Sequence, residues 1–291
     1  MLKKESKIFV AGHNGMVGSA VVRLLKQKNF KNILTTDRKK LDLTNQAKVN
    51  NFFKKNNIDF VVLSAAKVGG ILANSTYKAD FIYENLMIQS NVINAACING
   101  IKNLIFLGSS CIYPKTLNRR IKESDLLSDY LEETNEPYAI AKIAGIKMCE
   151  SYNDQYRMNY KCLMPCNLFG ENDNFDLKNS HFLPSIMHKI YLCREKKIKN
   201  LELFGNGKPL RELMYVDDLA DAIIFFMKKK TREVLINIGS GYEKTIDYYV
   251  KKICQVMNAH DVKLKYNNNL KMNGTQRKIL DCTLAKSYGW T

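Results

Sequence analysis

Short apolar runs that suit buried strands alternate with helical stretches over the first half of the chain. Strands are expected at residues 8–11, 33–36, 60–64, 104–107 and 161–164. Helices are expected between them at 16–28, 46–56, 81–99 and 137–156. Such alternation is typical of βαβ units around a parallel sheet, and right-handed crossovers place helices on both faces. It predicts an α/β chain with a doubly wound Rossmann fold.

A glycine-rich segment lies where the first expected strand meets the first expected helix. This pattern gives a tight turn, lets the backbone approach a pyrophosphate and lets the helix sit close to the strand. The helix N-terminus then offers free N–H groups to phosphate oxygens. The segment predicts a dinucleotide site formed by Gly12, Asn14, Gly15, Met16, Val17 and Gly18.

The end of the second expected strand bears on which dinucleotide binds. An acidic side chain there would accept a hydrogen bond from a ribose 2′-hydroxyl and favour NAD, whereas an arginine would pair with the 2′-phosphate of NADP. The chain has Asp37 and Arg38 side by side. These residues alone leave the choice open.

The regular alternation of strands and helices ends after Asn167. A polar, turn-rich stretch at 170–180 precedes expected elements at 182–195, 201–204, 217–227, 235–238 and 246–257. We therefore expect residues 1–166 to form the Rossmann domain that binds the dinucleotide. Residues 167–291 are expected to form mainly a smaller C-terminal α/β lobe for substrate, with segments near 210–245 returning to the first domain.

Charge and cysteine content bound the partners and the compartment. The net charge of +17 could indicate nucleic acid, but the lysines lie in short clusters beside amphipathic segments, so we expect no nucleic-acid partner. The 8 cysteines form no C-x-x-C pair, which predicts reduced thiols and no metal site. No apolar run approaches the ~18 residues of a membrane span, and the apolar run at 8–11 is too short for a signal peptide. We expect a cytoplasmic protein without a membrane partner.

A tyrosine and a lysine four residues apart supply candidate chemistry. Tyr138 and Lys142 would share one helix face, and an ammonium near a phenol lowers the phenol pKa. Such a phenol can protonate an alkoxide that forms as hydride arrives at a ketone. Ser109 follows the strand at 104–107, where a hydroxyl faces the ligand crevice and can donate to the carbonyl oxygen.

Several longer motifs together resemble the GDP-L-fucose synthase family, within the extended short-chain dehydrogenase/reductase superfamily. The resemblance runs from about Lys7 to Trp290 and is carried by segments 65–71, 108–115, 135–145, 172–175 and 211–218. It implies a bifunctional 3,5-epimerase and 4-reductase that acts on GDP-4-keto-6-deoxy-D-mannose. Ser109, Tyr138 and Lys142 would be the reductase triad, and Cys111 and His181 would together form the acid/base pair for epimerisation.

The resemblance also implies the binding residues. NADPH is the implied cofactor, with Arg38 on its extra phosphate and Ala65, Ala66 and Lys142 beside it. The implied substrate residues are Ser110, Asn167, Lys189, Arg211 and Lys278. Asn14 and Lys189 stand where family members often have arginine. The family usually continues beyond Thr291 into a further helix, so apolar surface is expected to be exposed there.

The sequence leaves three hypotheses about function open. The first is epimerisation followed by 4-keto reduction. The second is reduction alone, on a related GDP-4-keto sugar such as a 6-deoxyheptose. The third is a cofactor-binding regulatory protein without catalysis, against which the intact Ser109, Tyr138 and Lys142 argue. Helices 81–99 and 138–156 are candidates for a four-helix face between two copies, so a homodimer is expected.

Overall fold

Six parallel strands form the central sheet of the structure, a computed structural model that describes residues 2–177, 179–267 and 274–291. In spatial order they are β2 (Ile33–Leu34), β1 (Ile8–Ala11), β3 (Phe60–Leu63), β4 (Asn103–Leu107), β5 (Asn159–Pro165) and β9 (Leu235–Ile238). The order reverses direction between β1 and β3, and ligands of open α/β sheets bind outside the strand carboxyl ends at such a point. The expected doubly wound Rossmann fold is confirmed.

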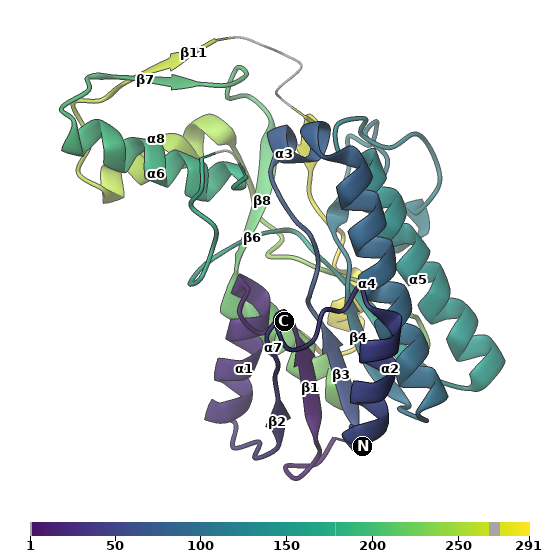
Figure 1. Cartoon of the computed structure of the whole chain (residues 1–291). Coiled ribbons are helices and arrows are strands. Elements are labelled where there is room, and N and C mark those ends of the chain that lie inside the picture. Colours follow the sequence, from purple (N-terminus) through teal and green to yellow (C-terminus); the bar gives the residue numbers. More distant parts are fainter. Residues whose placement is uncertain (1, 178, 268–273) are drawn as a thin grey trace.

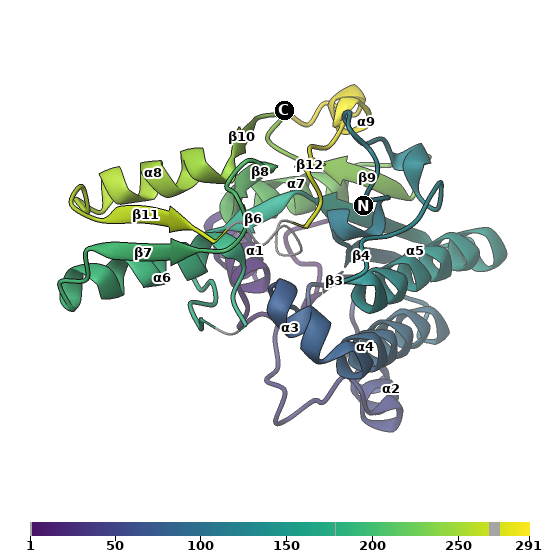
Figure 2. The same ribbon diagram turned by 90° about the horizontal axis from the view of Figure 1, so that it is seen from above.

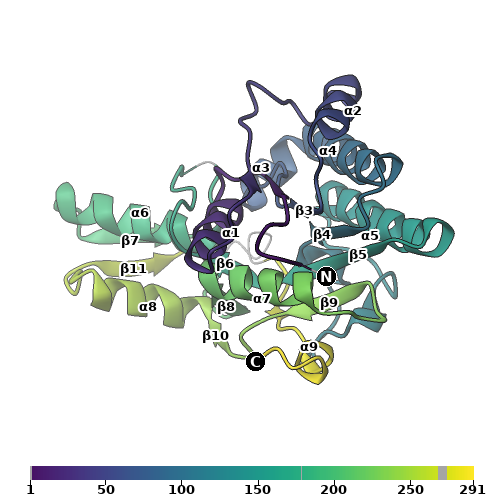
Figure 3. The ribbon, with the colours of Figure 1, turned by 90° about the horizontal axis from the view of Figure 1, so that it is seen from below.

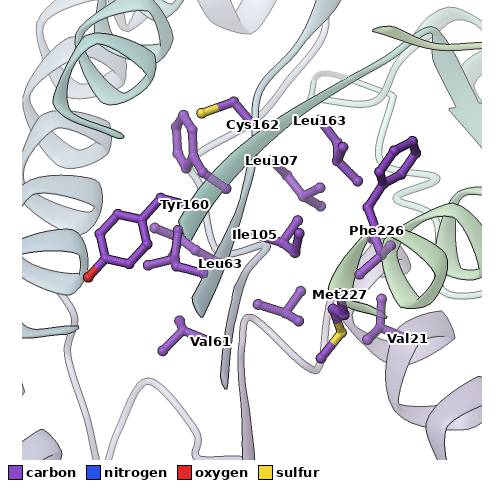
Figure 4. Packing of buried hydrophobic residues seen from close by; sticks show 14 of the residues in the cluster. Val21, Val61, Leu63, Ile105, Leu107, Tyr160, Cys162, Leu163, Phe226 and Met227 are labelled. Atoms are coloured by element: carbon purple, nitrogen blue, oxygen red, sulfur yellow. The ribbon is translucent and has the colours of Figure 1, made fainter. Parts of the chain in front are cut away.

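Helices cover both faces of this sheet (Figures 1 and 3). One face carries α1 (Met16–Gln27) and α7 (Val216–Lys228), and the other carries α2 (Gln46–Lys55), α4 (Lys78–Ile98) and α5 (Glu136–Tyr156). Figure 4 shows Val21 of α1 and Phe226 and Met227 of α7 against the strands, with Tyr160 on the opposite face of β5. All four side chains are buried, so the sheet is a two-sided core.

The second part of the chain contains two smaller sheets. In the first, β8 (Leu210–Tyr215) pairs with β6 (Asn167–Phe169), β10 (Glu243–Thr245) and β12 (Arg277–Lys278). In the second, β7 (Asn200–Leu203) pairs with β11 (Lys263–Tyr266) beside α6 (Phe182–Glu195) and α8 (Ile246–Val256). Figure 2 shows this second group projecting from the main body, and it has a small core of its own.

A buried carboxylate joins the sheet of β8 to the segment that follows β9 of the central sheet. Glu212 of β8 is fully buried and accepts hydrogen bonds from the backbone N–H of Gly241 at 2.6 Å and of Leu280 at 2.8 Å. Leu280 follows β12 and Gly241 follows β9. Since Arg211 and Lys278 lie one and two residues from these anchor points, the contacts fix the backbone of two candidate substrate residues.

Some elements were not expected from the sequence. They are the helices α3 (Ile71–Thr76) and α9 (Thr283–Ser287), the short strands β6, β8, β10, β11 and β12, and two 3-10 turns at Ser110–Ile112 and Glu123–Asp125. Near the end of the chain, Tyr288 and Trp290 pack against the main core while partly buried. None of the described helices has the length and apolar character needed to cross a lipid bilayer.

Candidate active site

The glycine loop after β1 packs so closely that two of its positions exclude any side chain. Gly12 has φ of +89°, and a Cβ there would lie 2.6 Å from the Ala65 nitrogen. A Cβ on Gly18 would lie 2.1 Å from the Gly12 carbonyl oxygen. The backbone at Gly15 is more open, with its nearest neighbour 3.5 Å from such a Cβ. The loop is thus tight against β1 and β3 and accessible at its middle glycine.

The start of α1 is suited to a diphosphate. No side chain caps this helix, so the first-turn N–H groups, including those of Met16 and Val17, lack intrahelical acceptors. Uncapped N–H groups beside an open glycine bind phosphate oxygens without side-chain obstruction. Ala66 follows Ala65 at the end of β3, across the loop from Gly12. These features fit a nicotinamide dinucleotide at the β1–β3 crevice.

A polar network lies beyond β2. The Asn14 side-chain amide donates to Asp37 Oδ1 at 2.8 Å, and His13 Nε2 lies 3.5 Å from the same oxygen. The exposed Arg38 donates to Glu84 of α4 at 3.3 Å. Asp37 and Arg38 therefore have separate partners, although they are adjacent in the chain.

The candidate reductase residues meet at the carboxyl end of β4. Lys142 is 3% exposed and donates to the Leu107 carbonyl at 2.8 Å. Its ammonium lies 5.8 Å from the centre of the Tyr138 ring. The Ser109 side chain hydrogen-bonds Tyr138 and lowers the phenol pKa. The structure thus brings Ser109, Tyr138 and Lys142 together.

One electrostatic expectation from the sequence is wrong. The Tyr138 pKa is raised above its ordinary value, because burial and the nearby Cys111 outweigh the Ser109 hydrogen bond. Burial also lowers the Lys142 pKa to about 8. A buried phenol resists ionisation, since the charged form loses its hydration. Tyr138 therefore stays protonated near neutral pH, which suits an acid that delivers a proton.

A thiol, an imidazole and an ammonium form a second cluster beside these residues. Cys111 is 6% exposed, and burial raises its pKa while Lys278, Ser109 and Lys142 oppose the rise. Burial of the imidazole and the Lys278 charge lower the His181 pKa, although the residue as a whole is exposed. Lys278 thus acts on both groups. Near neutral pH the pair is a protonated thiol and an unprotonated imidazole, one able to give a proton and the other to take one.

Gly70, at the start of α3, holds the loop that carries His181. Its N–H donates to the Asn179 carbonyl at 2.9 Å. A Cβ on Gly70 would lie 2.3 Å from the Ser180 oxygen. Phe81 of α4 packs edge-on against Tyr138, with ring centres 6.2 Å apart. The sequence predicts no role for Gly70 or Phe81. Gly70 lies in segment 65–71, one of the motifs that carry the family resemblance.

The candidate substrate residues divide into two groups. Arg211 is 9% exposed, and burial lowers its pKa to about 10. It interacts electrostatically with Lys278, so the two cations belong to the thiol–imidazole region. Ser110 is buried in the 3-10 turn beside Cys111, and Asn167 begins β6, which pairs with β8.

Lys189 belongs to the projecting lobe. Its ammonium lies 4.7 Å from the centre of the Phe204 ring, and it interacts electrostatically with Glu202 and Cys193. These three neighbours of Lys189 all lie in or beside α6 and β7 of that lobe. Within the described ranges, no cluster of three or more His, Cys, Asp or Glu side chains could hold a metal ion.

Comparison with known proteins identifies the family. Residues 8–239 match the NAD dependent epimerase/dehydratase family. The chain belongs to this family. It is 48% identical to GDP-L-fucose synthase 1 of Arabidopsis thaliana over 100% of this chain and 90% of that protein. It is 44% identical to GDP-L-fucose synthase of Escherichia coli strain K12 over 98% of this chain and 91% of that protein. The resemblance seen in the sequence motifs is confirmed.

A solved relative extends the comparison to three dimensions. The GDP-mannoheptose C4 reductase of Campylobacter jejuni, solved with NADP bound, superimposes with a TM-score of 0.89. It is 35% identical, and the match covers 100% of this chain and 94% of that one. The epimerase/dehydratase fold thus extends over both the Rossmann sheet and the projecting lobe.

Proposed function

We propose that this chain converts GDP-4-keto-6-deoxymannose into GDP-L-fucose by 3,5-epimerisation followed by NADPH-dependent reduction of the C4 ketone. The single observation that supports it best is the position of Lys278, which acts electrostatically on both Cys111 and His181. Two acid–base groups share one cation at the edge of the Ser109–Tyr138–Lys142 set. The names of the plant and bacterial relatives agree with this reaction.

Epimerisation comes first in this proposal because it needs the ketone. A C4 ketone acidifies the hydrogens at C3 and C5, so an imidazole base can remove a proton and a thiol can return one to the other face. His181 is the base and Cys111 the acid for the first transfer, after which their protonation states are exchanged. The Lys278 ammonium stabilises the anionic intermediate or the thiolate.

Reduction follows on the epimerised sugar. The nicotinamide, when bound, supplies hydride to C4. Ser109 donates a hydrogen bond to the carbonyl oxygen, and Tyr138 delivers its proton to the developing alkoxide. The loop from Gly12 to Gly18, with Ala65 and Ala66, holds the diphosphate, while Arg38 holds the 2′-phosphate. Lys142 orients the cofactor and supports the phenol.

Deuterium exchange tests the proposal directly. The ketosugar is incubated with enzyme in D₂O without NADPH, and we expect deuterium at C3 and C5 by NMR. Full NADPH oxidation without any such exchange would leave only the reductase. A variant Cys111→Ser serves as the comparison, and it should lose exchange while retaining reduction of the already epimerised ketosugar.

Reduction alone on a related GDP-4-keto heptose is the second candidate. It is favoured by the likeness to the GDP-mannoheptose C4 reductase, which covers the whole chain. A panel of GDP-4-keto hexoses and heptoses, compared by kcat/KM for NADPH oxidation, separates the two candidates.

We further propose where the molecule works and how it assembles. Residues 167–291 act mainly as the substrate lobe, with Asn167, Lys189, Arg211 and Lys278 on the GDP-sugar. A homodimer would pair α4 and α5 of two copies, and Tyr83, Ile98 and Tyr156 are exposed on these helices. All 8 cysteines are free, which suits the cytoplasm. Light scattering after size-exclusion chromatography measures the oligomeric state.

A further inference from the structure

Beyond β2, a carboxylate lies at the position where dinucleotide folds recognise the ribose. Asp37 lies 19 positions after Gly18 in the sequence, where dinucleotide folds place the acidic residue that accepts from the ribose 2′-hydroxyl. Its Oδ1 accepts from the Asn14 amide at 2.8 Å and lies 3.5 Å from His13 Nε2. Both groups come from the glycine loop. These two contacts therefore hold the carboxylate beside the diphosphate site.

The same contacts weaken the site for a 2′-phosphate. Asn14 contributes a neutral amide at the loop, where a cation would attract a phosphate. A 2′-phosphate bound to Arg38 would also lie near the Asp37 carboxylate, and like charges at short range repel. The amide of Asn14 and the carboxylate of Asp37 thus both disfavour a 2′-phosphate.

Arg38 still leaves room for the phosphorylated cofactor. Its side chain is 72% exposed and bonds Glu84 at 3.3 Å. Glu84 also binds Lys67, at the shorter distance of 2.6 Å. Because Lys67 continues to neutralise Glu84, Arg38 can turn to a phosphate without leaving a bare carboxylate behind.

We propose that this chain binds NADH as well as NADPH, preferring neither by more than about tenfold, with Asp37 accepting hydrogen bonds from the ribose hydroxyls of NADH. The proposal deepens the proposed function and rests on cofactor binding at the β1–β3 crevice. It makes Asp37 the residue that decides the cofactor preference of the same site.

Titration calorimetry with NADH and NADPH, in the absence of sugar, tests this proposal. Asp37→Asn should weaken NADH binding by about tenfold or more and leave NADPH binding equal or tighter, since a hydrogen bond to a charged acceptor is lost. Arg38→Met should do the reverse and weaken NADPH alone. Asp221→Asn is the matched control: Asp221 is 52% exposed against 54% for Asp37, and it pairs with Lys28, which directly follows α1. It should leave both dissociation constants unchanged.

The outcomes separate this proposal from the proposed function. A wild-type preference for NADPH well above about tenfold, or an Asp37→Asn variant with an unchanged ratio of dissociation constants, overturns the role of Asp37. Failure of the wild-type protein to bind either cofactor contradicts the proposed function instead. The rates of reduction with NADH and with NADPH provide a second measure of the cofactor preference.

Discussion

The reductase residues and the epimerase residues are held by different kinds of structure. Tyr138 and Lys142 lie on a helix of 21 residues packed against a six-stranded sheet. His181 ends a loop, and Lys278 lies on a strand of two residues. The first set is fixed by a large core, whereas the second depends on a few backbone contacts such as those of Gly70. We infer that the reductase set tolerates disturbance of the lobe, while the epimerase pair does not.

Gly18→Ala gives the largest expected effect, a loss of stability. It tests the rigidity of the Rossmann core that holds the reductase residues. The new Cβ would meet the Gly12 carbonyl oxygen at 2.1 Å, and neither backbone segment can move without disturbing β1. We expect the free energy of unfolding to fall by about 3 kcal/mol, measured by urea denaturation. Gly100→Ala is the control, because that position has open space and costs only about 1 kcal/mol from its positive φ. Equal losses in the two variants would contradict the account.

Gly70→Ala tests the loop that holds the epimerase residue His181. Its Cβ would lie 2.3 Å from the Ser180 oxygen, so the loop carrying His181 must move. Deuterium exchange at C3 and C5 should fall by about a hundredfold, while NADPH oxidation on the already epimerised ketosugar stays within about threefold. Leu72→Ala, on the same helix but half exposed, is the control. Parallel losses of both activities would show that Gly70 supports the whole fold rather than His181.

Asp176→Asn provides an independent test of the same loop without adding atoms. The Asp176 carboxylate accepts from the backbone N–H and the side chain of Asn179, both at 2.9 Å. Weakening this turn should lower exchange in the same direction as Gly70→Ala, by about tenfold. Thermal melting of both variants checks that the protein remains folded.

The pH dependence of reduction tests the buried lysine of the reductase set. Burial lowers the Lys142 pKa from 10.5 to about 8, so its charge is present below pH 8 and is lost as the pH rises. We expect kcat/KM for reduction to fall by about tenfold per pH unit above this value. Lys161→Met is the matched control, because Lys161 is equally buried, with its pKa lowered to about 8, but lies on β5 outside the site. If Lys161→Met changed the pH profile of kcat/KM, the alkaline fall could not be assigned to Lys142.

Lys278→Met gives the smallest expected shift. Lys278 lowers the pKa of both His181 and Cys111, so its removal raises both. Because His181 must be neutral to take a proton, the acidic limb of the exchange profile should move to higher pH by less than about one unit. Lys244→Met, at an exposed position of β10 on the other side of β8, should leave the limb in place. A limb that moves to lower pH would contradict the proximity of Lys278 to His181.

The sequence predicted the large elements and missed the small ones for a physical reason. Strands such as 8–11 and helices such as 182–195 carry their own periodicity, and the structure has both with the expected bounds. β12 has two residues and exists only because β8 lies beside it. No local pattern reports such a pairing. The order of strands around β9 likewise depends on contacts between distant segments.

The candidate site shows the same limit at the level of charge. Spacing alone placed Tyr138 and Lys142 on one helix face, and the structure agrees. The direction of the phenol pKa was wrong, because burial depends on the surrounding fold rather than on the four-residue spacing. The pairing of Asn14 with Asp37 spans two loops and was also not foreseen.

The reductase residues and the epimerase residues are expected to carry out two separable chemistries in one site. This separation is tested most directly on Tyr138→Phe and His181→Asn, with deuterium exchange measured on the starting ketosugar and NADPH oxidation measured on the already epimerised ketosugar. Tyr138→Phe should lose reduction by about 10²-fold to 10⁴-fold and keep exchange, since only the alkoxide needs the phenol proton. His181→Asn should lose exchange and keep reduction. If either variant loses both activities together, the two chemistries are not separable and the account is wrong.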